Sequence, residues 1–198
     1  TKPSPENETK TNQAHEEYLE WGNMPLEAPN SGVDLTSAFR SLREKLEPNT
    51  IITNGAGNYA VWGHRLFRFS QFRTQLAPIS GSMGYGLPAA IAAKLRHPNQ
   101  TVIALAGDGC FQMTENEFAT AVQYNAAVIV FVIDNEMYGT IRMHQHKNYK
   151  GKYKHTGLIN PDFNKLAVAM GGQGYTVVNT EDFMNIFNDA KDWTSKNN

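Results

Sequence analysis

The sequence predicts an α/β fold in which helices cover both faces of a mainly parallel sheet, giving three layers. Two observations support this prediction. Short apolar runs over 50–53, 101–106 and 128–133 lack the polar alternation of a half-exposed strand, and helical stretches separate them. Strands that are apolar on both sides are typical of parallel sheets buried between helices.

The first helix and strand begin after residue 33. Asp34 is expected to cap a helix, because apolar residues follow it at helical spacing. These residues are Leu35, Ala38, Phe39, Leu42 and Leu46. The strand 50–53 follows, bounded by Pro48 and Gly55. An Ala-rich helix is predicted over 87–95, and the strand 101–106 comes after it.

The second half continues the alternation. We predict a helix over 114–123, the strand 128–133, a helix over 163–170 and a strand over 175–178. A last helix is indicated by apolar residues at helical spacing. They are Phe183, Ile186, Phe187, Ala190 and Trp193.

Composition excludes several classes of protein. The 198 residues carry a formal net charge of −1, so no global field favours nucleic acid or an acidic membrane. No apolar run is long enough to span a bilayer, and no signal peptide is recognisable. The single cysteine, Cys110, excludes an internal disulfide framework and favours a cytoplasmic location.

The chain is expected to divide at residue 34. Residues 1–33 begin with a polar stretch that has little to bury, so we predict a linker or an extended N-terminal segment there. Residues 34–198 are predicted to form the domain. Because the chain begins at Thr1 rather than Met, we expect a piece of a longer protein, cut within the domain at its C-terminal end.

Two predicted strands end in residues that bind hard cations. Asp108 stands in a Gly-Asp-Gly turn directly after the strand 101–106, and Asn135 follows the next strand 27 residues later. Mg²⁺ prefers oxygen ligands and usually takes only one or two from protein side chains, leaving the rest to backbone oxygen, water and phosphate. This pair beside a Gly-rich turn therefore predicts a magnesium and diphosphate site.

A family resemblance rests on these motifs. The segment 107–139 resembles the thiamine diphosphate motif, in which Gly-Asp-Gly is followed about 27 residues later by a paired Asn/Asp-Asn. The segment 81–90 is similar to the turn and helix that hold the two cofactor rings in acetolactate synthase and benzoylformate decarboxylase. From about 34 to 183, the chain resembles the C-terminal diphosphate-binding domain of this family, with its three-layer thiamin diphosphate-binding fold.

The resemblance implies thiamine diphosphate and Mg²⁺ as cofactors. Asp108, Asn135 and the backbone carbonyl of Met137 would bind the metal, and the N–H groups of Gly109 and Cys110 at a helix start would meet a phosphate. The full set of implied cofactor-binding residues is Ala56, Gly57, Asn58, Gly81, Ser82, Met83, Gly107, Asp108, Gly109, Cys110, Asn135, Met137, Tyr138 and Gly139.

The resemblance also implies roles within the reaction. Met83 would wedge beneath the cofactor and bend it, and the Gly81 carbonyl would accept a hydrogen bond from its amino group. The catalytic glutamate of the family belongs to a separate pyrimidine-binding domain, so we expect no catalytic residue in this chain and no activity from it alone. The whole enzyme, a homodimer or homotetramer, would decarboxylate or ligate 2-oxo acids.

Other interpretations remain open at this stage. The turn over 55–60 fits the G-x-G-x-x-A pattern of an NAD(P)-binding Rossmann module, but no Asp or Glu lies between 48 and 107 to hold a ribose. A non-catalytic thiamine diphosphate-binding protein is a further alternative. The basic stretch 141–155 is expected to be a solvated loop, with a phosphate patch or a metal site at His144 and His146 as its alternatives.

Overall fold

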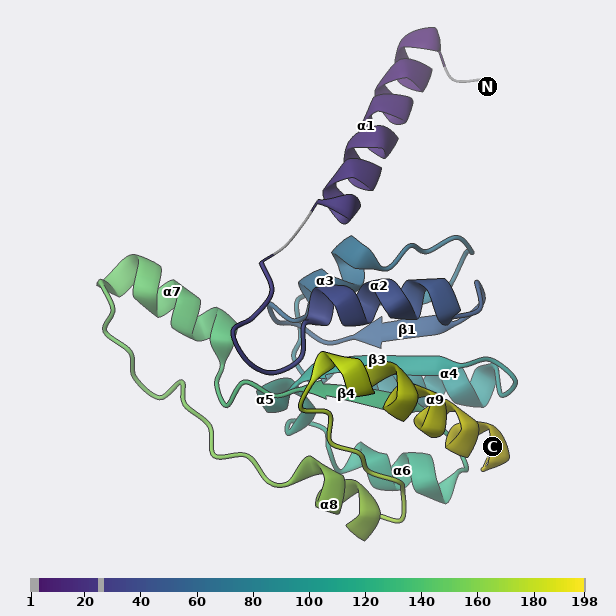
Figure 1. Cartoon of the computed structure of the whole chain (residues 1–198), viewed down its shortest axis with the longest axis vertical. Coiled ribbons are helices and arrows are strands. Elements are labelled where there is room, and N and C mark those ends of the chain that lie inside the picture. Colours follow the sequence, from purple (N-terminus) through teal and green to yellow (C-terminus); the bar gives the residue numbers. More distant parts are fainter. Residues whose placement is uncertain (1–3, 25–26, 198) are drawn as a thin grey trace.

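The computed structural model describes residues 4–24 and 27–197. Residues 1–3, 25–26 and 198, which belong to the predicted linker and to the end of the predicted domain, lie outside the described residues. The predicted α/β fold is confirmed. Four parallel strands form one sheet in the order β2-β1-β3-β4, and helices lie on both of its faces (Figure 1).

In chain order, the elements of the described residues are α1 (Pro5–Asn23), α2 (Leu35–Lys45), β1 (Ile51–Asn54), α3 (Ala60–Leu66), β2 (Gln75–Leu76), α4 (Gly86–Arg96), β3 (Val102–Gly107), α5 (Asp108–Phe111), α6 (Glu117–Gln123), β4 (Ile129–Ile133), α7 (Gly139–Tyr149), α8 (Phe163–Ala169) and α9 (Thr180–Lys196). Strands and helices alternate from α2 to β3, whereas α7, α8 and α9 follow one another without a strand between them.

The central strand β3 divides its side chains between two hydrophobic clusters. Ile103 and Leu105 point to one face, whereas Val102, Ala104 and Ala106 point to the other. Every residue of β3 is buried, which explains why its sequence shows no polar alternation. The sheet is therefore the middle one of three layers.

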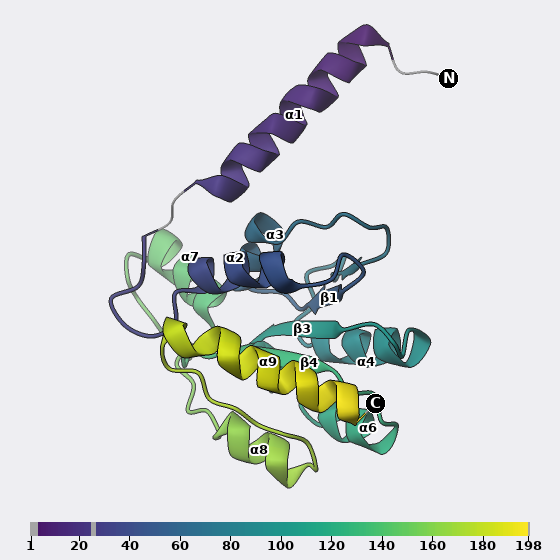
Figure 2. The ribbon, with the colours of Figure 1, turned by 45° about the vertical axis from the view of Figure 1, so that its right-hand side comes forward.

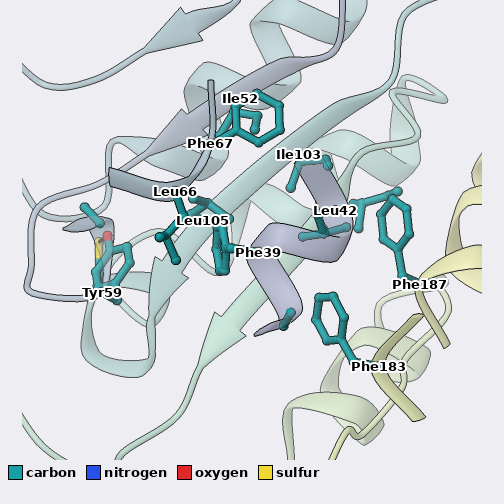
Figure 3. Close-up of a cluster of buried hydrophobic side chains, with 14 residues drawn as sticks. Phe39, Leu42, Ile52, Tyr59, Leu66, Phe67, Ile103, Leu105, Phe183 and Phe187 are labelled. Carbon is teal, nitrogen blue, oxygen red and sulfur yellow. Dashed lines mark hydrogen bonds between the residues drawn. The ribbon is translucent and has the colours of Figure 1, made fainter. Parts of the chain in front are cut away.

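Helices α2, α3 and α9 cover the Ile103 face of the sheet. Phe39 and Leu42 of α2 lie at the centre of this cluster (Figure 3). The helix predicted near the C-terminus is confirmed as α9. Its Phe183 and Phe187 pack against Phe131 of β4, with ring centroids 5.7 and 6.1 Å apart. This face thus joins the two ends of the predicted domain.

Helices α4, α6 and α8 cover the opposite face. Leu87, Ala90 and Ile91 of α4 pack on the small side chains of β3. Phe163 of α8 meets Phe111 edge to face, with ring centroids 5.5 Å apart. Phe111, in the segment that follows β3, is therefore packed into the cluster on this face.

The expected extended N-terminal segment contains a helix instead. Ser4 caps α1 through the Asn7 N–H (3.3 Å), Pro5 occupies its first turn, and Glu6 pairs with Lys10 one turn later. Of its described residues only Gly22 is buried, so the segment is solvated as expected but helical, and it projects from the sheet in Figures 1 and 2. No described helix is long and apolar enough to cross a membrane.

Two further local predictions are wrong. Residues 175–178 form no strand, and β4 remains an edge strand of the described sheet. The expected loop over 141–155 is largely the helix α7, none of whose residues is buried. An exposed helix has no apolar face, so it leaves no periodic signal in the sequence.

The predicted cap of α2 is confirmed. The Asp34 carboxylate accepts the Thr36 N–H at 2.9 Å and the Ser37 hydroxyl at 2.5 Å. Hydrogen bonding from Ser37 lowers the pKa of Asp34, with a smaller opposing effect of burial. The Asp34 N–H also donates to the Thr180 hydroxyl at 2.8 Å, which joins the starts of α2 and α9.

We therefore expect Asp34→Ala to lower the free energy of unfolding by about 1 kcal/mol, since a helix cap is lost. The lowered pKa means that the charged carboxylate is favoured in the folded state. Its contribution is present above the ordinary pKa of 3.8 and is lost as the pH falls through the lower folded value.

Urea unfolding at pH 7 and at pH 3 measures both effects. Asp34→Asn keeps a capping oxygen and should retain most of the stability at pH 7 while losing the acid dependence. Equal stability of Asp34→Ala and the unmodified chain at pH 7 would contradict the cap assignment.

Candidate functional site

The site lies where β3 and β4 end. Their parallel register pairs Gly107 with Ile133, so Asp108 and Asp134 leave the sheet side by side and Asn135 follows one residue later. Asp108 is only 3% exposed and begins the short helix α5. This is the carboxyl edge of the sheet, the edge at which parallel α/β sheets bind ligands.

A cleft of about 220 Å³ opens at this edge. All the residues that the resemblance singled out line it except Ser82, whose hydroxyl is 2.9 Å from that of Ser80. The lining residues are Ala56, Gly57, Asn58, Tyr59, Gly81, Met83, Gly107, Asp108, Gly109, Cys110, Ile133, Asn135, Met137, Tyr138, Gly139, Thr140 and Ile141. Segments far apart in sequence thus share one cleft.

The Asp108 carboxylate is held in place by two donors. Its Oδ1 accepts the Gly109 N–H at 2.8 Å, and its Oδ2 accepts the side-chain amide of Asn160 at 2.8 Å. Each carboxylate oxygen can accept more than one hydrogen bond or metal bond, so both keep a free lone pair. The Asp108 carboxylate is therefore held in one orientation and can still accept a bond from a metal ion.

Asn135 and Met137 sit on a loop with its own internal bonds. The Asn135 Oδ1 accepts the Met137 N–H at 3.3 Å, and the Met137 carbonyl accepts the Gly139 N–H at 2.9 Å. Residues 156–158 support this loop through two backbone hydrogen bonds. The Tyr138 N–H donates to the Thr156 carbonyl at 2.9 Å, and the Leu158 N–H donates to the Glu136 carbonyl at 2.8 Å. Two candidate oxygen ligands are thus presented by a braced turn.

These residues fit a magnesium ion. They supply one carboxylate, one amide oxygen and one backbone carbonyl, which is the donor chemistry that Mg²⁺ takes from proteins. No cluster of three His, Cys, Asp or Glu side chains suited to a metal occurs among the described residues. His146 instead lies against Tyr153, with its Nδ1 2.5 Å from the phenol oxygen and the rings stacked.

Two tyrosine rings cover the glycines of the strand-end turn. A Cβ added at Gly107 would lie 2.9 Å from the ring of Tyr59, and one added at Gly109 would collide with the ring of Tyr138. Glycine is therefore required at both positions by close approach. The backbone of this turn is buried and lines the cleft.

Tyr59 belongs to the site although the sequence analysis did not select it. Its hydroxyl donates to the Cys110 sulfur at 3.1 Å, and burial, followed by this contact, raises the pKa of the hydroxyl. Cys110 also accepts the Gly84 N–H at 3.0 Å. The only sequence signal for Tyr59 is its position directly after the turn over 55–58.

Cys110 therefore joins three parts of the cleft. Its sulfur connects the strand-end turn to Tyr59 and to the turn over 81–84, in which Gly81 and Gly84 have positive φ values of 68° and 80°. Met83, between those glycines, lines the cleft and packs against the cluster of α2 and α9. A packing and bonding role of Cys110 agrees with its burial.

The first turn of α7 closes another side of the cleft. Thr140 and Asn58 form a reciprocal pair, because the Thr140 hydroxyl donates to the Asn58 Oδ1 at 3.0 Å and accepts the Asn58 N–H at 3.1 Å. The G-x-G-x-x-A turn after β1 thus contributes to the same cleft as Asp108.

Comparison with known proteins gives consistent matches. Residues 55–197 match the family described as "Thiamine pyrophosphate enzyme, C-terminal TPP binding domain". The chain is 44% identical over 129 residues to the acetolactate synthase catalytic subunit, mitochondrial, of Aspergillus candidus, covering 65% of this chain and 19% of that protein. It is 35% identical over 172 residues to acetolactate synthase of Mycobacterium leprae, covering 83% and 28%.

A solved structure matches the fold as well. The thiamine diphosphate-dependent 4-hydroxybenzoylformate decarboxylase of Rhodococcus jostii superposes with a TM-score of 0.80 at 27% identity, covering 86% of this chain and 32% of that one. The chain thus spans roughly a fifth to a third of the proteins it matches.

The family match spans both the strand-end turn and the loop after β4, the two segments that bring Asp108 and Asn135 to one cleft. The chain belongs to the thiamine pyrophosphate enzymes, as a C-terminal TPP binding domain.

Proposed function

We propose that this chain is the diphosphate-binding part of an acetolactate synthase-like enzyme that decarboxylates or ligates 2-oxo acids with thiamine diphosphate and Mg²⁺. One observation carries the proposal: Asp108 and Asn135, which follow neighbouring strands, line the same cleft as Gly107 and Gly109. The acetolactate synthases among the relatives support the choice of reaction class.

Within this proposal the metal is held by three oxygens. Asp108 supplies the charge, Asn135 the amide oxygen and Met137 the backbone carbonyl. The N–H groups of Gly109 and Cys110 lie in the first turn of α5, where neither has a partner within the helix. The Gly109 N–H donates to the Asp108 Oδ1, so the Cys110 N–H is the main donor assigned to a phosphate oxygen, with Gly109 beside it. Tyr138 and Gly139 border the same region of the cleft.

The ring end of the cofactor is assigned to the other side of the cleft. Gly81 and Met83 line the cleft, and we assign the Gly81 carbonyl and the Met83 side chain to the contacts with the cofactor rings. Gly84 donates its N–H to the Cys110 sulfur. Ala56, Gly57 and Asn58 complete the wall. The bound cofactor supplies a carbon nucleophile and an electron sink, while the protein residues bind it, orient it and exclude water.

The remaining catalytic group is proposed to come from another domain. Among the described residues that line the cleft, Asp108 is the only Asp or Glu, and it is assigned to the metal. A glutamate of a pyrimidine-binding domain would complete the site, with a homodimer or homotetramer as the full assembly. Two acetolactate synthase relatives have mitochondrial names, and a cytoplasmic location for this protein stays a prediction.

The metal assignment predicts the behaviour of Asp108→Ala. In the full-length protein, the apparent affinity for thiamine diphosphate at fixed Mg²⁺ should fall on the order of 100-fold, since the only charged protein ligand is lost. Calorimetric titration measures it. Asp192→Ala, on the outer helix α9, is the matched control, and unchanged magnesium-dependent affinity in Asp108→Ala would refute the assignment.

The role of Met83 predicts a different pattern. Met83→Ala should weaken cofactor binding only modestly but slow hydrogen exchange at C2 of the bound cofactor more strongly, because the bend between the two rings is less supported. Met184→Ala is the control, since Met184 packs against the same hydrophobic cluster from α9. If both variants lose only thermal stability and exchange is unchanged, Met83 is a packing residue.

The assignment of the acid to another domain predicts that the 198-residue chain alone will not turn over pyruvate. Assays with saturating thiamine diphosphate and Mg²⁺ should show no acetolactate, whereas the full-length protein should produce it. Turnover by the isolated chain would overturn the assignment.

A further inference from the structure

We propose that Asn160 is a positioning residue of the magnesium site: its side-chain amide holds Asp108 in the orientation that binds the metal. The inference rests on the proposed function and deepens it. Asn160 does not line the cleft, and it lies 52 residues beyond Asp108 in sequence. It acts through Asp108, the candidate ligand that it contacts.

The amide of Asn160 bridges the ends of the two strands. Its Nδ2 lies 2.8 Å from the Asp108 Oδ2 and 2.7 Å from the Asp134 Oδ1. A primary amide has two N–H donors, so each carboxylate receives its own hydrogen bond. One neutral side chain therefore fixes both carboxylates at once.

The orientation of this amide is itself determined. Gln112 donates from Nε2 to the Asn160 Oδ1 at 2.8 Å, which leaves the NH₂ group of Asn160 directed at the carboxylates. A flipped amide would place its oxygen against two negative groups and lose all three hydrogen bonds. The network thus admits one arrangement.

The backbone near Asn160 is also anchored at the site. Leu158, two residues earlier, donates to the Glu136 carbonyl at 2.8 Å, and Gly157 forms a bridge with Met137. Asn160 is therefore attached to the loop that carries Asn135 and Met137. Its amide connects that loop to the end of β3.

Electrostatics explains why such a bridge is needed. Neighbouring strands lie about 4.8 Å apart, so two carboxylates that leave them at the same level repel one another. Asp134 is exposed and can turn toward water, whereas Asp108 is 3% exposed and depends on its protein donors. The bond to Asp108 is consequently the one that matters for the metal.

The test uses the full-length protein and measures Mg²⁺ binding by calorimetry at saturating thiamine diphosphate. Asn160→Ala should weaken Mg²⁺ binding 10- to 100-fold, the range found when a group that orients a metal ligand is removed. Asn160→Asp should lose at least as much, because it keeps the shape but replaces the donor with a third carboxylate. Neither measurement depends on turnover.

Two variants separate positioning from general packing. Asn164→Ala removes an amide from the same segment whose bond goes to Thr176 (3.4 Å) rather than to Asp108, and it should leave Mg²⁺ affinity unchanged. Gln112→Ala should give a smaller loss in the same direction. It also carries the test if Asn160→Ala does not fold, since the side chain of Gln112 bonds to Asn160, whereas its contact with Asp108 is made by the backbone N–H, which the substitution keeps.

The outcomes are distinguishable. If the unmodified protein binds no thiamine diphosphate with Mg²⁺, both this inference and the proposed function fail. If it binds the pair and the Asn160 variants bind Mg²⁺ equally well, or lose only thermal stability, the positioning role alone is wrong.

Discussion

The register between β3 and β4 is the constraint on which the site depends. Pairing Gly107 with Ile133 sets Asp108 and Asp134 side by side and brings Asn135 to the same cleft. The core fixes this register. A slip of one residue in β3 would send Ile103 and Leu105 into the face where alanines now meet α4, and would lose the packing on α2. Burial far from the cleft therefore sets the geometry of its candidate ligands.

The cleft is stabilised by buried hydrogen bonds in its interior, which we call the floor, and by exposed hydrogen bonds at its edge near α7, which we call the rim. The floor contains buried hydrogen bonds from Tyr59 and Gly84 to the Cys110 sulfur, in a region where unpaired polar groups are costly. The rim, at the start of α7, rests on the exposed pair of Asn58 and Thr140. Because α7 buries none of its residues, its local stability is expected to be lower than that of the sheet.

The amide of Asn160 joins the ends of β3 and β4. It connects the buried Asp108 to the exposed loop after β4, which is braced by residues 156–158. A site assembled from two strand ends needs such a cross-connection, because each strand fixes only its own backbone. The side chains at this edge of the sheet are oriented by residues outside the strands, such as Asn160.

Much of this organisation was predictable from local sequence. Buried strands such as 101–106 are uniformly apolar, Asp34 is a strong cap followed by a helical pattern, and the spacing from Asp108 to Asn135 spans one helix and one strand. Each of these signals arises from residues adjacent in the chain. They predicted the three-layer fold and a site at the carboxyl edge of the sheet, whereas most of the lining residues were named from the family resemblance.

Only the tertiary structure decided the rest. The exposed helices α1 and α7 leave no apolar period, and whether 175–178 forms a strand depends on a neighbouring strand. Tyr59 and Asn160 reach the site through side-chain bonds across 51 and 52 residues of chain. The physical reason is common to all of them: a local pattern records what a segment buries, whereas the partner of an exposed or long-range polar group is set by how the whole chain folds back on itself.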